Sequence, residues 1–130
     1  MAGFGVLGLC QSGALLGGTQ YISREAIEAM LRFAAWLPAQ SEIVFSFAPP
    51  DDELDGDDLT AAIHGVTLTE AMGEPWKTRL TAPEVFALLT RLEFGEVFHL
   101  TPKRAQQRYF AGRNDMLRAP RLEQLVAAIV

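Results

Sequence analysis

Short, nearly continuous apolar runs alternate along the chain with stretches in which apolar residues recur every three or four positions. The apolar runs lie at residues 13–18, 42–48, 95–100 and 125–130, and they predict β-strands. The periodic stretches predict helices after Ser23, around residues 59–66 and after Thr81, with a further short helix over 102–110. Residues 111–120 are predicted to form a loop.

Capping residues set the boundaries of the two best-defined helices. Ser23 is a predicted N-cap, and Pro38 is predicted to end the helix that follows it. Thr81 is followed three residues later by Glu84, which is the capping-box spacing. Gly95 is a suitable stop at the far end of that helix.

The order of elements predicts a single α/β domain over residues 1–130. The first two strands are linked through a helix, which favours a parallel pair. The last two have no long helix between them, which favours an antiparallel pair. The run at 42–48 is nearly all apolar, which is typical of a strand buried on both faces. The run at 13–18 also has the pattern of a buried strand, although only a dozen residues precede it.

Composition is that of an ordinary globular domain, with 130 residues, 49% hydrophobic and 21% charged. Cys10 is the single cysteine, so no internal disulfide forms, and its apolar setting predicts a buried structural thiol. The first 19 residues are apolar but rich in glycine and lack a basic residue, so we expect neither a signal peptide nor a membrane span. We therefore expect a cytoplasmic protein without a membrane partner.

Charge is unevenly distributed. Residues 51–58, DDELDGDD, carry six acidic groups within a chain whose net charge is −5. Their first half matches an EF-hand loop, but the twelfth position is Ala62, where a bidentate glutamate is required. A solvated acidic loop or helix start is therefore favoured. His64 and His99 stand in predicted regular structure without metal-ligand spacing, so we predict structural roles for them and no metal site.

Two segments are candidates for binding. Gly17 and Gly18 stand at the carboxyl end of a predicted strand, where α/β proteins bind ligands, and Thr19 and Tyr21 follow. The tail segment QQRYFAGRNDMLR places arginines among aromatic residues, a pattern found at anion and nucleic-acid sites. The alternative, which is favoured, is a structured loop whose aromatics pack inward while its arginines pair with the acidic half.

Three segments, GGTQYISREAIEAML, GEPWKTRLTAPEVFALLTRLEF and RYFAGRNDMLR, carry a resemblance in their order and spacing. Together they resemble the C-terminal half of a bacterial, mycobacterial and actinobacterial-type family of S-adenosylmethionine-dependent O-methyltransferases related to leucine carboxyl methyltransferases. The resemblance covers about residues 15–130, and YFAGR-x-D-x-LR is its most specific motif.

The resemblance implies strands four to seven of a class I (Rossmann-like) methyltransferase sheet, with an antiparallel last strand. It implies S-adenosylmethionine as cofactor and, as acceptor, a carboxylate or hydroxyl of a small molecule. The implied cofactor contacts are Gly17, Thr19 and Tyr21. The implied residues of the acceptor side are Arg108, Tyr109, Arg113 and Asp115.

Two departures limit what the resemblance implies. The family often carries a glutamate five positions before the tyrosine, where this chain has Leu16, and residues 1–12 do not resemble the usual approach to strand four. The family's glycine-rich cofactor loop and ribose-binding acid would lie upstream. We therefore expect the chain alone to be inactive and strand four to be an exposed edge covered by a homodimer or another partner. The alternative function is a non-catalytic module that binds an anion, a nucleic acid or a protein through its tail.

Overall fold

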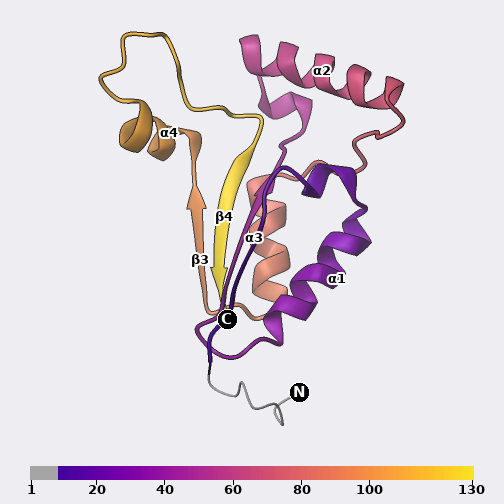
Figure 1. Ribbon diagram of the computed structural model, residues 1–130, viewed down its shortest axis with the longest axis vertical. Coiled ribbons are helices and arrows are strands. Elements are labelled where there is room, and N and C mark those ends of the chain that lie inside the picture. Colours follow the sequence, from indigo (N-terminus) through magenta and orange to yellow (C-terminus); the bar gives the residue numbers. More distant parts are fainter. Residues whose placement is uncertain (1–8) are drawn as a thin grey trace.

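The computed structural model describes residues 9–130, and its centre is one four-stranded sheet in the order β1-β2-β4-β3 (Figure 1). The strands are β1 (Ser12–Leu15), β2 (Glu42–Phe47), β3 (Glu96–Leu100) and β4 (Gln124–Ile129). β1 runs parallel to β2, and β4 is antiparallel to both β2 and β3. The predicted antiparallel last pair is therefore confirmed. The carboxyl ends of β1, β2 and β3 and the start of β4 share one edge of the sheet, called here the carboxyl edge.

The helices are α1 (Arg24–Ala35), α2 (Gly56–Ala71), α3 (Ala82–Arg91) and the short α4 (Pro102–Ala105). A π-helical turn continues α4 over Gln106–Phe110, and 3-10 turns occupy Thr19–Tyr21 and Asp51–Glu53. Ser23 caps α1 by accepting a hydrogen bond from the backbone N–H of Ala26. Both halves of the capping box predicted at Thr81 and Glu84 are present, and Arg24 donates to Glu84. The Arg24 guanidinium, and next the backbone N–H of Thr81, lower the pKa of Glu84.

The hydrophobic core lies between one face of the sheet and the two helices α1 and α3. α1 contributes Ile27, Leu31 and Ala34, and these spacings form one stripe along the helix. Alternate strand residues complete the core, because successive side chains point to opposite faces of a sheet. The buried strand residues of this face are Ile43, Phe45, Phe47, Val126 and Ala128.

The opposite face of the sheet is only partly covered, which corrects the prediction that the second strand is buried on both faces. Val44 is half-buried, and Phe98 of β3 leaves 54% of its surface exposed. α1 and α3 lie on the same side of the sheet, and α2 lies beyond the carboxyl edge (Figure 1). We call this second surface the open face.

The N-terminal strand is an exposed edge, and this corrects the prediction for Cys10. β1 pairs only with β2 among the described residues, and Ser12, Gly13 and Ala14 are exposed. Cys10 precedes this edge strand and is itself exposed. The expectation for the first 19 residues falls partly on residues 1–8, which lie outside the described residues. Within residues 9–130, no helix is long and apolar enough to cross a bilayer.

Replacing the cap residue Thr81→Ala should lower the free energy of unfolding by about 1 kcal/mol, because the first turn of α3 loses an acceptor for its N–H groups. Chemical denaturation followed by circular dichroism measures this. Thr90→Ala is the matched control, since Thr90 is exposed on the same helix. Equal stabilities of the two variants would contradict a stabilising role of the capping box.

Candidate functional site at the carboxyl edge of the sheet

A sharp glycine turn carries the chain from β1 into α1 at the carboxyl edge. Gly17 is exposed and has φ +69°, a conformation that residues with side chains adopt rarely, and this explains why β1 stops at Leu15. Thr19 is 2% exposed, and its hydroxyl donates to the backbone carbonyl of Ser46 at 2.6 Å. Tyr21 closes the turn and is half-buried. Leu16, where the resembled family has a glutamate, is 61% exposed and apolar.

A buried serine holds this turn against the two neighbouring strands. The hydroxyl of Ser46, at the end of β2, accepts a hydrogen bond from the Gly17 N–H at 2.7 Å. The same hydroxyl donates to Oε1 of Glu123, the residue before β4, at 2.8 Å. Ser46 is 0% exposed, so both capacities of its hydroxyl are satisfied inside the protein.

The glutamate lies directly against the glycine turn. A Cβ placed on Gly17 would be 3.4 Å from Glu123 Oε1, which is van der Waals contact. Glu123 is an exposed residue, and no ion pair joins it to a cation within residues 9–130. The edge therefore presents a positioned carboxylate beside accessible backbone, an arrangement suited to a ligand that carries a positive charge or an N–H donor.

Sequence reasoning identified the glycine turn but missed Ser46 and Glu123. It also missed Gln20, which is 8% exposed. The side-chain Oε1 of Gln20 accepts no hydrogen bond from any residue in the described part of the chain. A buried acceptor without a donor costs about 1–3 kcal/mol, so this atom is available to a donor from a ligand or another chain segment. Ser46 carried one signal, because it is the only polar residue in the apolar run 43–48.

The four candidates for the acceptor side lie between β3 and β4. Arg108 and Tyr109 belong to the π-helical turn, and Tyr109 is 62% exposed. Arg113 donates through Nε to Oδ1 of Asp115 at 3.0 Å and through Nη2 to Oδ2. The Arg113 guanidinium lowers the pKa of Asp115, and the carboxylate in turn raises the pKa of Arg113. Within residues 9–130, no hydrogen bond or ion pair joins this segment to the glycine turn.

The rest of the tail is tied to the acidic run. Arg118 Nη1 lies 3.0 Å from Asp58 Oδ2, without the alignment of a hydrogen bond, and Arg121 Nη1 lies 3.5 Å from Asp55 Oδ1. The predicted pairing of tail arginines with the acidic half is thus confirmed for these two. The predicted inward packing of the aromatics is wrong for Tyr109, since α4 ends at the rim of the sheet and leaves its ring in solvent.

The acidic run itself forms a helix start, as predicted. Asp51–Glu53 make a 3-10 turn, Asp55 is the N-cap of α2, and Ala62 is 0% exposed within that helix. No group of three metal-ligating side chains occurs in residues 9–130. His99 packs against the rings of Phe47 and Phe86, and its Nε2 lies 2.8 Å from Gln124 Oε1, which is a structural role.

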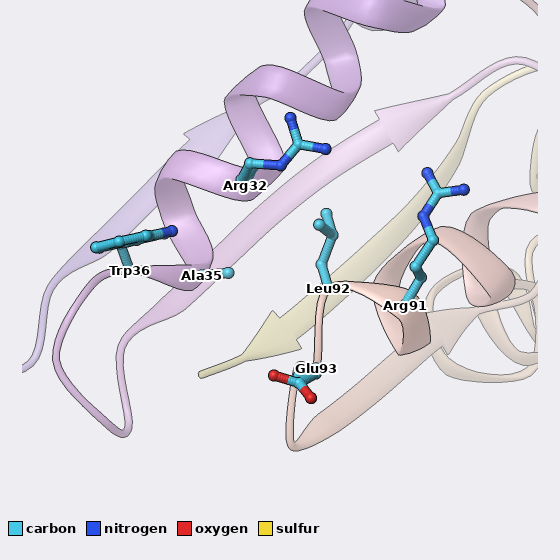
Figure 2. Close-up of a pocket in the computed structure, with 6 residues that line it drawn as sticks. All are labelled: Arg32, Ala35, Trp36, Arg91, Leu92 and Glu93. Atoms are coloured by element: carbon cyan, nitrogen blue, oxygen red, sulfur yellow. The ribbon is translucent and has the colours of Figure 1, made fainter.

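A separate open groove of about 560 Å³ lies between the C-terminal ends of α1 and α3 (Figure 2), away from the carboxyl edge (Figure 1). Arg32 and Arg91 line it, with Leu92 between them, Glu93 below, and Trp36 on the far side of Arg32 from Arg91. Both guanidiniums donate to the same oxygen of Glu28, at 3.1 and 2.6 Å. Because this carboxylate already occupies both arginines, the groove is a weaker candidate for an anion site than the carboxyl edge is for a cation.

Comparison with known proteins finds similarity of structure but not of sequence. No family model and no curated protein sequence matches the chain. A solved structure described as a "possible exported protein", from Bordetella parapertussis, is 19% identical, with a TM-score of 0.59 over 92% of this chain and 38% of its own. A "putative O-methyltransferase" from Nostoc punctiforme PCC 73102 is 14% identical, with a TM-score of 0.56 over 92% of this chain and 31% of its own.

These likenesses concern the fold. The chain spans about a third of the length of the two solved structures that it matches. Its strand order, with an antiparallel last strand inserted beside β2, is a partial Rossmann-like sheet of the class I methyltransferase type.

Removing the serine hydroxyl tests the network at this edge. Ser46→Ala should lower the free energy of unfolding by about 1–3 kcal/mol, because the Gly17 N–H loses its acceptor and Glu123 loses a donor. Ser12→Ala, at an exposed position of β1, should change it by less than about 0.5 kcal/mol. Urea denaturation of both variants gives the comparison, and a cost at Ser46 no larger than at Ser12 would refute the network.

Proposed function

We propose that this chain is the C-terminal portion of an S-adenosylmethionine-dependent O-methyltransferase that modifies a carboxylate or hydroxyl of a small molecule. The observation that carries the proposal is the sheet order β1-β2-β4-β3 with its antiparallel last strand. The chain with this sheet is similar in overall fold to the Nostoc structure. The glycine turn lies at the carboxyl edge of this sheet, where α/β proteins bind ligands.

The residues at the carboxyl edge fit one end of the cofactor. Gly17 lacks a side chain and is exposed, so a ligand can approach its backbone closely. Thr19 is buried and holds the turn through its hydrogen bond to Ser46, which gives it a positioning role. Tyr21 follows at the rim. In the resembled family a separate glycine-rich turn, after the first strand of the complete sheet, would hold the rest of the cofactor, whereas the resemblance assigns the glycine turn of this chain to the fourth strand.

The acceptor side is proposed to be the segment between β3 and β4. When bound, S-adenosylmethionine would supply an electrophilic methyl group, because an acceptor oxygen can form a bond to the methyl carbon as the carbon–sulfur bond breaks and S-adenosylhomocysteine leaves. Arg108 makes no ion pair within the described residues, so its guanidinium is available to an acceptor carboxylate. Tyr109 is exposed beside it, and the Arg113–Asp115 pair fixes the loop that follows. The protein's contribution is to hold the acceptor in line with the methyl group.

The non-catalytic alternative, a module that binds nucleic acid through its tail, is less well supported. Arg113, Arg118 and Arg121 each form an ion pair with an aspartate. Binding of phosphates would have to displace these pairs, which reduces the counterion release that drives nucleic-acid binding. The tail is therefore better suited to one small acidic group than to a polyanion.

Calorimetry or equilibrium dialysis with S-adenosylmethionine tests the proposed function. The isolated chain should bind it with a Kd between about 0.1 and 10 mM, because one wall of the site contributes only part of the binding free energy. ATP, which shares the adenosine but not the amino-acid part, is the control and should bind less well. Micromolar binding would show that the chain is not part of a divided site, and no binding at 10 mM would contradict a cofactor site here.

We further propose that additional strands of the same sheet cover β1. In the two solved structures, the part of the chain outside the match is about twice as long as the part inside it. In this chain, an unpaired edge, the open face and an exposed stripe on α1 all adjoin β1 or its sheet. The stripe consists of Ala26, Ala29, Phe33 and Trp36, of which Phe33 and Trp36 are 73% and 71% exposed. A neighbouring βα unit would bury the edge and this stripe together.

The isolated chain should then associate with itself through the exposed edge. The backbone polar groups of Gln11 and Gly17 form hydrogen bonds on the β2 side of the strand. Because alternate residues of an extended strand direct these groups to opposite sides, the N–H and C=O groups of Ala14 point to the open edge. Ala14→Pro should therefore reduce association measured by light scattering without weakening the β1–β2 pairing. Ala14→Val, which keeps the N–H, is the control. A wild-type monomer at high concentration would count against the proposal.

The source of the additional strands can be read from DNA. We expect the genomic sequence upstream of the Met1 codon to encode a glycine-rich strand–turn–helix segment, in frame or after a frameshift. An upstream region without such a segment would leave a second copy of this chain as the occupant of the edge.

A further inference from the structure

Glu123 is held at the carboxyl edge by a hydrogen-bond network that joins three strand ends of the sheet. Its partner Ser46 lies 77 positions away in sequence, and Gly17 lies a further 29 positions before Ser46. The hydroxyl of Ser46 donates to the carboxylate at 2.8 Å from a fully buried position. A hydrogen bond from a buried hydroxyl therefore orients the Glu123 side chain, although the residue itself is exposed.

The carboxylate has no basic partner within the described residues, a property that it shares with Asp52, Glu53 and Asp57 but not with four other acids near this edge. Those four acids are each paired with an arginine, in the pairs Asp51–Arg79, Asp55–Arg121, Asp58–Arg118 and Asp115–Arg113. Glu123 instead receives one neutral hydroxyl and is exposed. A carboxylate can accept several hydrogen bonds, so capacity remains on the side that faces solvent.

Its surroundings define the kind of ligand that it would take. Oε1 lies in van der Waals contact with the position of a Cβ on Gly17, so a group bound to the carboxylate also meets the bare backbone of the glycine turn. The matching chemistry is a compact cation with N–H donors, because charge-assisted hydrogen bonds to a carboxylate are the strong ones. An α-ammonium group of an amino acid meets this description.

We infer that Glu123 is a cofactor-binding residue whose carboxylate accepts hydrogen bonds from the α-ammonium group of S-adenosylmethionine, with Ser46 as its positioning residue. The inference rests on the proposed function and adds to it the residue that recognises the amino-acid end of the cofactor. Binding at this point involves no covalent step.

Nuclear magnetic resonance of the isotope-labelled full chain can test the inference at the millimolar ligand concentrations that a partial site requires. Two ligands are compared: S-adenosylmethionine, and methylthioadenosine, which lacks the amino-acid part. In the wild-type chain, only S-adenosylmethionine should shift the backbone amides of Gly17 and Glu123. This comparison needs no variant, so it stands even if a substitution disturbs folding.

Glu123→Gln gives the second arm, because the amide oxygen can still accept from Ser46 while the charge is removed. We expect about tenfold weaker binding of S-adenosylmethionine and unchanged binding of methylthioadenosine. A merely structural role would weaken both ligands alike. Glu96→Gln is the control, since Glu96 is an exposed carboxylate at the opposite end of the sheet.

The outcomes separate the inference from the proposed function. If S-adenosylmethionine shifts resonances around Tyr21 but Glu123→Gln binds it as well as the wild type, the inference is overturned and the function stands. The inference also fails if both ligands shift Glu123 equally. If neither ligand shifts any resonance of the wild-type chain at 10 mM, the proposed function fails and the inference with it.

Discussion

One buried hydroxyl fixes the arrangement on which the candidate site depends. Ser46 is the polar residue of an otherwise apolar strand end, and burying it is tolerated because it both accepts and donates a hydrogen bond. These two bonds join the end of β1, the end of β2 and the start of β4. The conformation of the glycine turn and the direction of the Glu123 carboxylate are therefore consequences of one interaction in the interior.

The second constraint is that only one face of the sheet is covered. α1 and α3 together bury the face formed by Phe45 and Val126, and this suffices for a core. The open face, the β1 edge and the outer stripe of α1 leave apolar groups in solvent. A ligand site built at the carboxyl edge of such a sheet has one wall, which is why a partial binding capacity is the natural expectation for this chain.

Ion pairs help to place the arginine-rich segment between β3 and β4 at the carboxyl edge of the sheet. The loop before β4 crosses to the N-terminus of α2, where Asp55 and Asp58 receive Arg121 and Arg118. The Arg121–Asp55 pair is solvent-exposed, so it contributes little to the stability of the fold, whereas Asp58 is a buried residue. The effect of both pairs is positional, because they bring the chain to Glu123 and leave Arg108 and Tyr109 at the rim.

The sequence by itself determined the features that depend on neighbouring residues. The capping box at Thr81, the cap at Ser23, the four strand positions and the antiparallel last pair were all predicted, because caps and periodicity act within a few residues. Tertiary structure alone decided that β4 inserts beside β2, that Cys10 is exposed and that Ser46 meets Glu123. These depend on which strands pair and which faces stay uncovered, and such contacts join residues far apart in the chain, where local patterns carry no information.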